Sequence, residues 1–327
     1  MTARWSLLSA LAFALALTAC GETSYAPEDA PRAGIEEGWP TVPEGAVFGA
    51  PTGVAVDSDG RIHVLHRASR GDAEGARPIP DPVVFVFARN GRLLGKWGAG
   101  EFVAPQGISI DGQDRVWITD TARHQVVRLD ASGQVQLALG ERGVAGNDAR
   151  HFDQPHDIAF DGDRILVSDT GNNRIVVFDV MGDFIEVLSP PGELDRPRSI
   201  AVDDDFLYVA DSGNDRVLLL DKRTGQMRGN RRQKATGAPF GLAAMGGGWL
   251  AVVEGLDKGG RASAILRIYD PEGGLYRVLD AGFASDASRG VDIALGRGGA
   301  VYLADPGADR IAKIDISRVP EAADGGE

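Results

Sequence analysis

The chain has 327 residues, of which 43% are hydrophobic and 25% charged, so it can form a hydrophobic core and is not a disordered chain. Its formal net charge of −13 disfavours binding to nucleic acid, because phosphate backbones would be repelled. The 44 glycines and many short runs of valine and isoleucine favour strands and turns over a helical bundle. The single cysteine excludes an internal disulfide and a zinc site with several cysteines.

The first segment, residues 1–19, is predicted to be a lipoprotein signal peptide. Arg4 provides a positive charge, and the apolar run after it is too short to span a membrane. The run ends at Leu17-Thr-Ala-Cys20, which resembles the bacterial lipobox, so Cys20 is expected to be acylated, with palmitate for example, after cleavage. The alternative is an ordinary cleaved signal followed by an unrelated cysteine.

The residue after the cysteine bears on the cellular location. Gly21 is not the aspartate typical of retention in the inner membrane of diderm bacteria, so the resemblance implies the outer membrane, facing the periplasm. Residues 20–40 are rich in Glu, Pro, Ala and Gly without apolar periodicity and are predicted to form the acylated cysteine and a flexible tether. A folded domain is expected over 41–318, with a disordered acidic tail over 319–327.

One pattern recurs along the folded region: proline, a variable residue, a small or polar residue, and then an alternating strand. Its copies begin at Pro51 (PTGVAVD), Pro105 (PQGISID), Pro155 (PHDIAFD), Pro197 (PRSIAVD), Pro239 (PFGLAA) and, in a weaker form, Gly290 (GVDIAL). The intervals of 42 to 54 residues suit a unit of four short strands. The sequence therefore predicts an all-β protein, a six-bladed β-propeller.

A second motif, D-x-G-N-x-R followed by Ile or Val, occurs at 169–175 and 211–217 and in a weaker form at 305–311. It resembles the NHL repeat. Because these Asp and Arg residues recur in several blades, whereas a ligand site would occur once, they are expected to hold loops and strands together. Blade six ends after three strands, so Thr41 to Phe48 is predicted to close the ring as its fourth strand.

In a propeller the inner strands begin at the mouth of the central channel, so the variable residue after each proline should face a common point. These residues are Thr52, Gln106, His156, Arg198, Phe240 and Val291. The ring is thus polar on one side and apolar on the other.

Two segments, Trp117 to Asp130 and His151 to Pro155, together with His66-Arg67, resemble the peptidyl-α-hydroxyglycine α-amidating lyase family over blades one to three. The resemblance implies an arginine in the active site, which falls on Arg67. It also implies a zinc ion held by three histidines that follow the proline-like position in alternating blades.

The implied zinc ligands fall on Gln106, Arg198 and Val291, and the family's active-site tyrosine is also absent. None of these three side chains is a usual zinc ligand, so zinc is not expected. Arg67 is retained, as is Asp292, which matches the aspartate after the family's third histidine. No cofactor is predicted, although the sequence leaves open whether calcium lies in the channel.

Of the five histidines, only His156 belongs to the inner ring. It is interpreted as a ligand-binding or proton-transferring group or, equally, as a histidine hydrogen-bonded between blades. Arg67 and Arg198 could together bind a carboxylate; the alternative is that each pairs with an acidic neighbour such as Asp292. Gln106 completes the set of ligand-binding candidates.

The leading hypothesis is a lipid-anchored envelope propeller without catalytic activity that binds a peptide, a small molecule or an envelope protein through its channel mouth and loops. Ala68 to Pro82 and Gly255 to Ser263 are the candidate recognition loops. The rival hypothesis is a divergent amidating lyase, or another lyase or hydrolase on the same scaffold.

Overall fold

The structure is a computed structural model. It describes residues 33–68, 77–130, 133–188, 194–232, 237–256, 262–281 and 290–318. The signal peptide, Cys20, the acidic tail and most of the two candidate recognition loops lie outside these ranges. No helix within them is long and apolar enough to cross a membrane.

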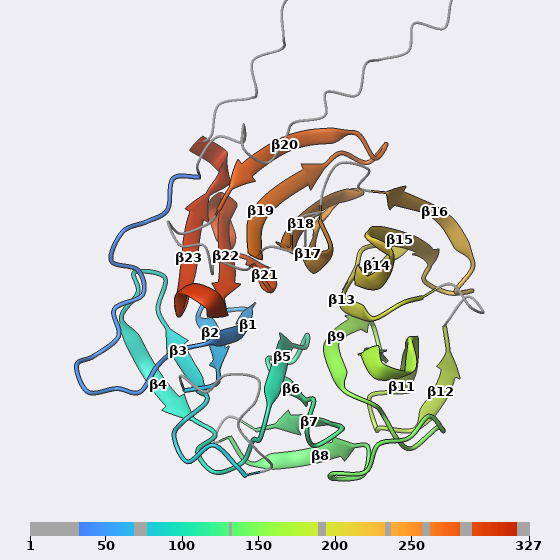
Figure 1. The fold of residues 1–327 in the computed structure, drawn as a ribbon, viewed down its shortest axis with the longest axis horizontal. Helices are drawn as coiled ribbons and strands as arrows, with labels where there is room; N and C mark the ends of the chain where they lie inside the picture. The colour runs from blue at the N-terminus through green and yellow to red at the C-terminus, as the bar shows by residue number, and fades with distance from the viewer. Residues whose placement is uncertain are drawn as a thin grey trace, which may run out of the picture.

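The described chain forms six antiparallel sheets around a central channel, which confirms the predicted all-β propeller (Figure 1). Blade one comprises β1 (Pro51–Val56), β2 (Ile62–His66), β3 (Val84–Phe87) and β4 (Leu93–Trp97). Blade two comprises β5 (Pro105–Ile110), β6 (Val116–Asp120), β7 (Gln125–Leu129) and β8 (Val135–Leu139). Blade three comprises β9 (Pro155–Asp161), β10 (Arg164–Asp169), β11 (Arg174–Asp179) and β12 (Phe184–Val187).

The remaining three blades follow the same order, from the channel outward. Blade four comprises β13 (Pro197–Val202), β14 (Phe206–Asp211), β15 (Arg216–Asp221) and β16 (Met227–Arg232). Blade five comprises β17 (Pro239–Gly246), β18 (Trp249–Leu256), β19 (Ala262–Tyr269) and β20 (Leu275–Asp280). Blade six comprises β21 (Asp292–Leu295), β22 (Ala300–Asp305) and β23 (Arg310–Asp315).

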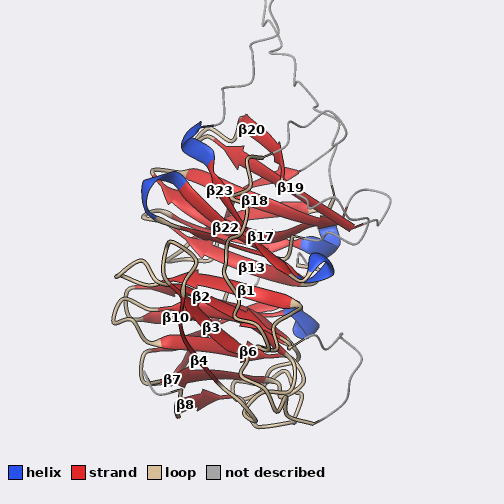
Figure 2. Ribbon diagram, turned by 90° about the vertical axis from the view of Figure 1, so that its left-hand side faces the viewer, coloured by secondary structure: helices blue, strands red, loops and turns tan. Residues whose placement is uncertain are grey.

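The recurring prolines mark where the inner strands begin. Each of the first five starts an inner strand, and the weaker sixth copy leads into β21. Within a blade, successive strands pair as antiparallel neighbours, so every blade is a simple meander. The side view shows mainly strands, with a few short helical turns between them (Figure 2). The hydrophobic core lies between the blades, because each sheet packs both faces against its neighbours.

The D-x-G-N-x-R loops join the second and third strands of blades three and four. In each, a short 3₁₀ turn, η2 (Thr170–Asn172) or η3 (Ser212–Asn214), is followed by a residue in the left-handed region. These residues are Asn173 and Asp215, at φ of 53° and 49°, a region that Asn and Asp tolerate better than most residues. Gly171 is required because a Cβ there would lie 2.6 Å from the Asp153 carboxyl carbon.

The contacts of this motif agree with its predicted structural role. Arg174 Nε donates to Asp169 Oδ2 at 2.7 Å, and Arg216 Nε donates to Asp211 Oδ2 at 2.6 Å. Both carboxylate side chains are fully buried. The motif therefore ties each loop to its own blade.

The N-terminal segment does close the ring, but through other residues than predicted. Ile35 forms an antiparallel bridge with Ile314 of β23, and Glu36 N donates to Lys313 O at 2.9 Å. The predicted strand over Thr41 to Phe48 is wrong. It contains a single bridge, from Thr41 to blade one, and is otherwise irregular.

The predicted tether boundary at residue 40 is also too late. Trp39 is only 5% exposed, and its ring centre lies 4.9 Å from that of Tyr302 in blade six. The indole Nε1 donates to Arg89 O at 3.1 Å, in blade one. Two isolated apolar residues, Ile35 and Trp39, produce no periodicity in the sequence. Trp39 nevertheless packs across the seam between the first and last blades, and Ile35 packs against blades five and six.

Candidate functional site

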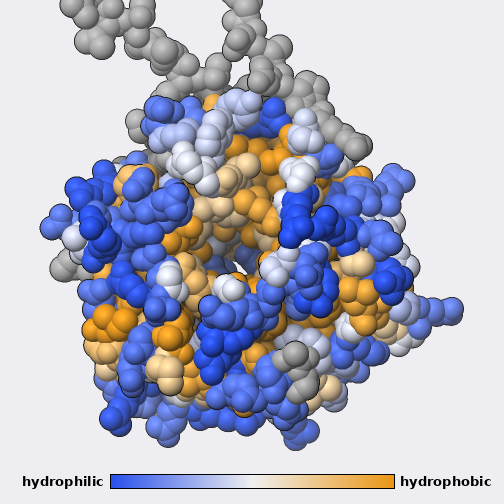
Figure 3. Space-filling model, turned by 180° about the vertical axis from the view of Figure 1, so that it is seen from behind, coloured by the Kyte–Doolittle hydropathy of each residue, from blue (hydrophilic) through white to orange (hydrophobic). Residues whose placement is uncertain are grey.

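The central channel contains a cavity of about 290 Å³ between the inner strands. Its walls are mostly Val, Ile, Leu and Ala side chains, interrupted by Ser109, Asp157 and Asp292. The rear face shows a small opening at its centre with hydrophobic residues around much of it (Figure 3). A polar group within such a wall needs a specific partner, because water is scarce there.

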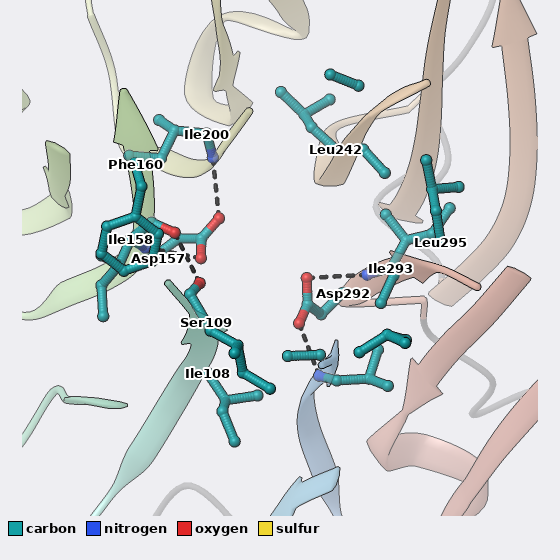
Figure 4. A pocket seen from close by; sticks show the side chains of 17 residues that line it. Ile108, Ser109, Asp157, Ile158, Phe160, Ile200, Leu242, Asp292, Ile293 and Leu295 are labelled. Atoms are coloured by element: carbon teal, nitrogen blue, oxygen red, sulfur yellow. Dashed lines mark hydrogen bonds between the residues drawn. The ribbon is translucent and has the colours of Figure 1, made fainter. Parts of the chain in front are cut away.

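Two carboxyl groups face each other across this channel, Asp157 from β9 and Asp292 from β21 (Figure 4). Asp157 accepts hydrogen bonds from Ser199 Oγ at 2.8 Å and Ile200 N at 3.0 Å, both in blade four. Asp292 accepts from Val54 N at 2.9 Å, in blade one. Each carboxyl group therefore joins its own blade to the next.

Both groups resist ionisation. Burial raises the pKa of Asp157 to about 6, although the hydrogen bonds from blade four act in the opposite direction. Burial, together with the negative charge of Asp157, raises the pKa of Asp292 well above its usual value. The sequence analysis included Asp292 but missed Asp157. The signal was an aspartate at the third position of the repeat, which occurs in blades three and six alone.

Next to the channel, Arg67 connects blade one to blade two. Its Nε donates to Pro105 O at 3.0 Å, and its Nη2 donates to Gln106 Oε1 at 2.6 Å. The residue is 6% exposed, so most of the guanidinium is held against the protein. Because a guanidinium only donates, the contact fixes the Gln106 amide with its oxygen toward Arg67 and its nitrogen away.

Arg198 makes the corresponding connection between blades three and four. Its Nη1 lies 3.2 Å from His156 Nε2, and its guanidinium carbon lies 4.0 Å from the centre of the Phe240 ring in blade five. Burial, and the positive charges of Arg198 and Arg67, lower the pKa of His156 well below its usual value. The imidazole is thus neutral, with Nε2 accepting from Arg198 and the proton on Nδ1.

These four residues form what we call the donor arc: Arg67, Gln106, His156 and Arg198, contributed by blades one to four. The acceptor atoms within the arc are already used by its arginines. Within the described ranges, the Gln106 amide nitrogen and His156 Nδ1 contact no acceptor. The donor arc therefore presents N–H groups, and its chemistry suits a group that accepts several hydrogen bonds and carries negative charge.

The other half of the predicted ring is buried. Phe240 and Val291 are 3% and 7% exposed and belong to a hydrophobic cluster between blades one and six. Thr52 is 5% exposed and donates to Pro105 O at 3.1 Å. These three residues are buried beside the donor arc: Phe240 lies under the Arg198 guanidinium, and Thr52 shares the Pro105 oxygen with Arg67.

A zinc ion does not fit the residues at the mouth. Val291 offers no lone pair, Arg198 is a cation, and the Gln106 oxygen is engaged by Arg67. The other histidines lie elsewhere, as predicted: His63 contacts Asp57 at 3.0 Å, and His151 contacts Asp148 at 2.8 Å. Within the described ranges, no three His, Cys, Asp or Glu side chains are grouped to hold a metal ion.

The carboxyl groups of Asp157 and Asp292 contain oxygen atoms, the ligand type that calcium prefers. Asp157 Oδ2 already accepts two hydrogen bonds, from Ser199 Oγ and Ile200 N, so both of its lone pairs are used. Asp157 Oδ1 and the two Asp292 oxygens accept one each and keep a second lone pair. The channel thus offers oxygen atoms of the kind that calcium binds, but from two side chains that resist ionisation, and the donor chemistry of the mouth does not fit zinc.

Comparison with known proteins supports this assignment of the fold. The profile of the NHL repeat matches residues 152–178. A probable peptidyl-alpha-hydroxyglycine alpha-amidating lyase of Caenorhabditis elegans is 31% identical over 160 residues, which is 45% of this chain and 46% of that protein. The chain thus spans less than half the length of this relative.

Solved propellers are similar over nearly the whole chain at low identity. A gluconolactonase from Xanthomonas campestris has a TM-score of 0.61 at 15% identity, over 88% of this chain and 97% of its own. A virginiamycin B lyase from Staphylococcus aureus has a TM-score of 0.58 at 16% identity, over 84% of each chain. The chain is thus a six-bladed propeller that contains a match to the NHL repeat and resembles the peptidyl-α-hydroxyglycine α-amidating lyases over about half of its length.

Proposed function

We propose that the protein is a binding propeller whose donor arc recognises a carboxylate on a peptide or a small molecule. The observation that carries the proposal is that both acceptor side chains of the arc are taken by its own arginines, at 2.6 Å and 3.2 Å. What the arc offers a ligand is positive charge and N–H groups. A carboxylate, with two oxygens and a negative charge, is complementary to both.

The first test compares two ligands that differ in charge. Hippurate carries a carboxylate on a short peptide-like chain, and hippuramide is its neutral amide. Calorimetric titration of the purified chain should show heat of binding for hippurate and at least tenfold weaker binding for hippuramide, because a charge-assisted hydrogen bond contributes about 1.5 to 3 kcal/mol. Equal affinities, or no binding of any carboxylate, would contradict the proposal.

A lyase of the amidating type is the second candidate. It is favoured by the sequence similarity to the Caenorhabditis elegans lyase and by Arg67, which the resemblance places in the active site. The assay is the release of glyoxylate from an α-hydroxyglycine peptide, with and without added zinc. Turnover that depends on zinc and is lost in His156→Ala would establish this second candidate in place of the first.

The cellular context that we propose is a lipid anchor at the envelope. The support is the lipobox-like sequence that ends at Cys20. In a diderm bacterium, labelling with an alkyne analogue of palmitate should mark the wild-type chain and not Cys20→Ser. The wild-type chain should also fractionate with the outer membrane. A Cys20→Ser chain that still takes up the label would contradict acylation at this residue. The partner would then be a periplasmic peptide, small molecule or envelope protein.

A further inference from the structure

The Arg198 guanidinium is a source of positive charge at the channel mouth. The inference drawn from it rests on the proposed function. Its guanidinium is fixed on two sides, by the His156 imidazole in blade three and by the Phe240 ring in blade five. A guanidinium keeps its charge at every pH at which a protein folds, and an aromatic face stabilises it further. The charge at this point is permanent and does not depend on a bound ion.

The same contacts remove the lone pairs that a metal ion would need. His156 Nε2 points at Arg198, and Gln106 Oε1 points at Arg67. The imidazole has no second lone pair to offer a metal ion, because Nδ1 carries the proton in this tautomer. The mouth is therefore short of ligands, and Arg198 adds electrostatic repulsion to any cation that approaches.

We infer that the channel mouth is a metal-free anion site, in which the Arg198 guanidinium supplies the positive charge that zinc supplies in the lyase family that the chain resembles. The ligand class is a carboxylate bound by guanidinium and amide N–H groups alone. A metal-chelating group gains nothing at such a site. Hippurohydroxamate should therefore bind no more tightly than hippurate, whereas a zinc site would prefer the hydroxamate.

The experiment titrates zinc chloride and hippurate separately into the purified chain. The wild type should show no stoichiometric zinc binding, and its hippurate affinity should be unchanged by EDTA. Arg198→Ala should weaken hippurate at least tenfold. The triple variant Gln106→His, Arg198→His and Val291→His should bind about one zinc per chain, because it restores three imidazoles at the implied positions.

Arg196→Ala is the matched control, since Arg196 lies two residues away with a side chain that is 67% exposed. It should change hippurate affinity less than twofold. Arg198→Gln is a second variant that keeps polar bulk without charge, and each variant is first checked for a wild-type circular dichroism spectrum and melting temperature. Loss of binding in folded Arg198→Gln supports the inference even if Arg198→Ala does not fold.

Three results would overturn the inference: stoichiometric zinc on the wild type, hippurate binding that EDTA abolishes, or unchanged affinity in both Arg198 variants. Hippurate binding that appears only with added zinc would leave the proposed function standing and remove this inference. A wild-type chain that binds no carboxylate with or without zinc would contradict the proposed function itself, so the two failures are distinguishable.

Discussion

Arg174 and Arg198 lie on neighbouring blades and differ in the groups that they contact. Arg174 donates to the buried carboxylate of Asp169 at 2.7 Å and to backbone oxygens of Asp148 and His151, each at 2.9 Å. Arg198 contacts an imidazole and an aromatic ring. The first belongs to a motif repeated in other blades, and the second stands at a position that differs in every blade. An arginine that recurs at the same position in several blades is thus expected to have a structural role. An arginine at a position that differs between blades is a candidate for binding.

The largest expected effect is on stability, at the repeated motif. Arg174→Ala leaves the Asp169 carboxylate, fully buried, without its ion-pair partner. Removing one partner of a buried pair costs about 3 to 5 kcal/mol of the free energy of unfolding. Urea denaturation should show this loss, with Arg196→Ala close to wild type. If Arg174→Ala and Arg198→Ala lowered the free energy of unfolding equally, the proposed difference between the two arginines would be contradicted.

The stability of the protein is also expected to depend on pH, through the buried residue His66. Burial lowers the pKa of His66 to about 4, and this ring lies between Phe48 and Phe85. The unfolded chain binds this proton near pH 6.5 and the folded chain does not, so stability is full above pH 6.5 and falls as pH decreases toward 4. His66→Phe should flatten this part of the profile, by up to about 3 kcal/mol at pH 4.

The measurement for His66 is urea denaturation at pH 4 to 7, taken as the difference between variant and wild type. Asp157 and Asp292 titrate in both proteins, so the difference isolates His66. His151→Gln is the control, because hydrogen bonds to Asp148 and Glu141 raise the pKa of His151 instead. An identical slope in wild type and His66→Phe would show that His66 does not titrate in this range.

At the donor arc, Arg67→Ala is expected to weaken hippurate by tenfold or more. The physical reason is the loss of one charged donor, worth about 1.5 to 3 kcal/mol, and of the contact that orients the Gln106 amide. Calorimetry measures the affinity and urea denaturation the stability. If Arg67→Ala lost as much stability as Arg174→Ala and kept its affinity for hippurate, Arg67 would have a structural role and not a binding role.

The smallest effect is expected at Phe240, which contacts Arg198 without reaching the ligand in our proposal. Phe240→Leu keeps an apolar wall and removes the cation–π contact, worth about 0.5 to 2 kcal/mol. Hippurate affinity should fall a few-fold, less than in Arg198→Ala. An effect as large as that of Arg198→Ala would mean that Phe240 touches the ligand directly.

Much of the fold could be predicted because the signals are local and repeated. The proline at the start of each unit predicts where β1, β5, β9, β13 and β17 begin. The closing residues could not be found in this way. Ile35 and Trp39 are isolated in the sequence, and they matter because the last blade lacks a fourth strand and the seam beside it must be filled.

The candidate site was predicted in part. Arg67, Gln106, His156 and Arg198 were recognised from the ring position and the resemblance, and the structure joins them into two hydrogen-bonded pairs, Arg67 with Gln106 and Arg198 with His156. Phe240 and Val291, also assigned to the mouth, are buried, and Phe240 contacts Arg198. Asp157 was missed, because a single aspartate in a strand looks like a strand-end residue until its partner across the channel is known.

The sequence by itself determined the number of blades, the loop motif and the absence of zinc-binding histidines, since each depends on residue types at fixed spacings. The tertiary structure alone decided which lone pairs are already used and which carboxyl groups face one another. The donor character of the arc comes from contacts between residues about forty positions apart, in different blades. No local pattern encodes such contacts, because the packing of one blade against the next creates them.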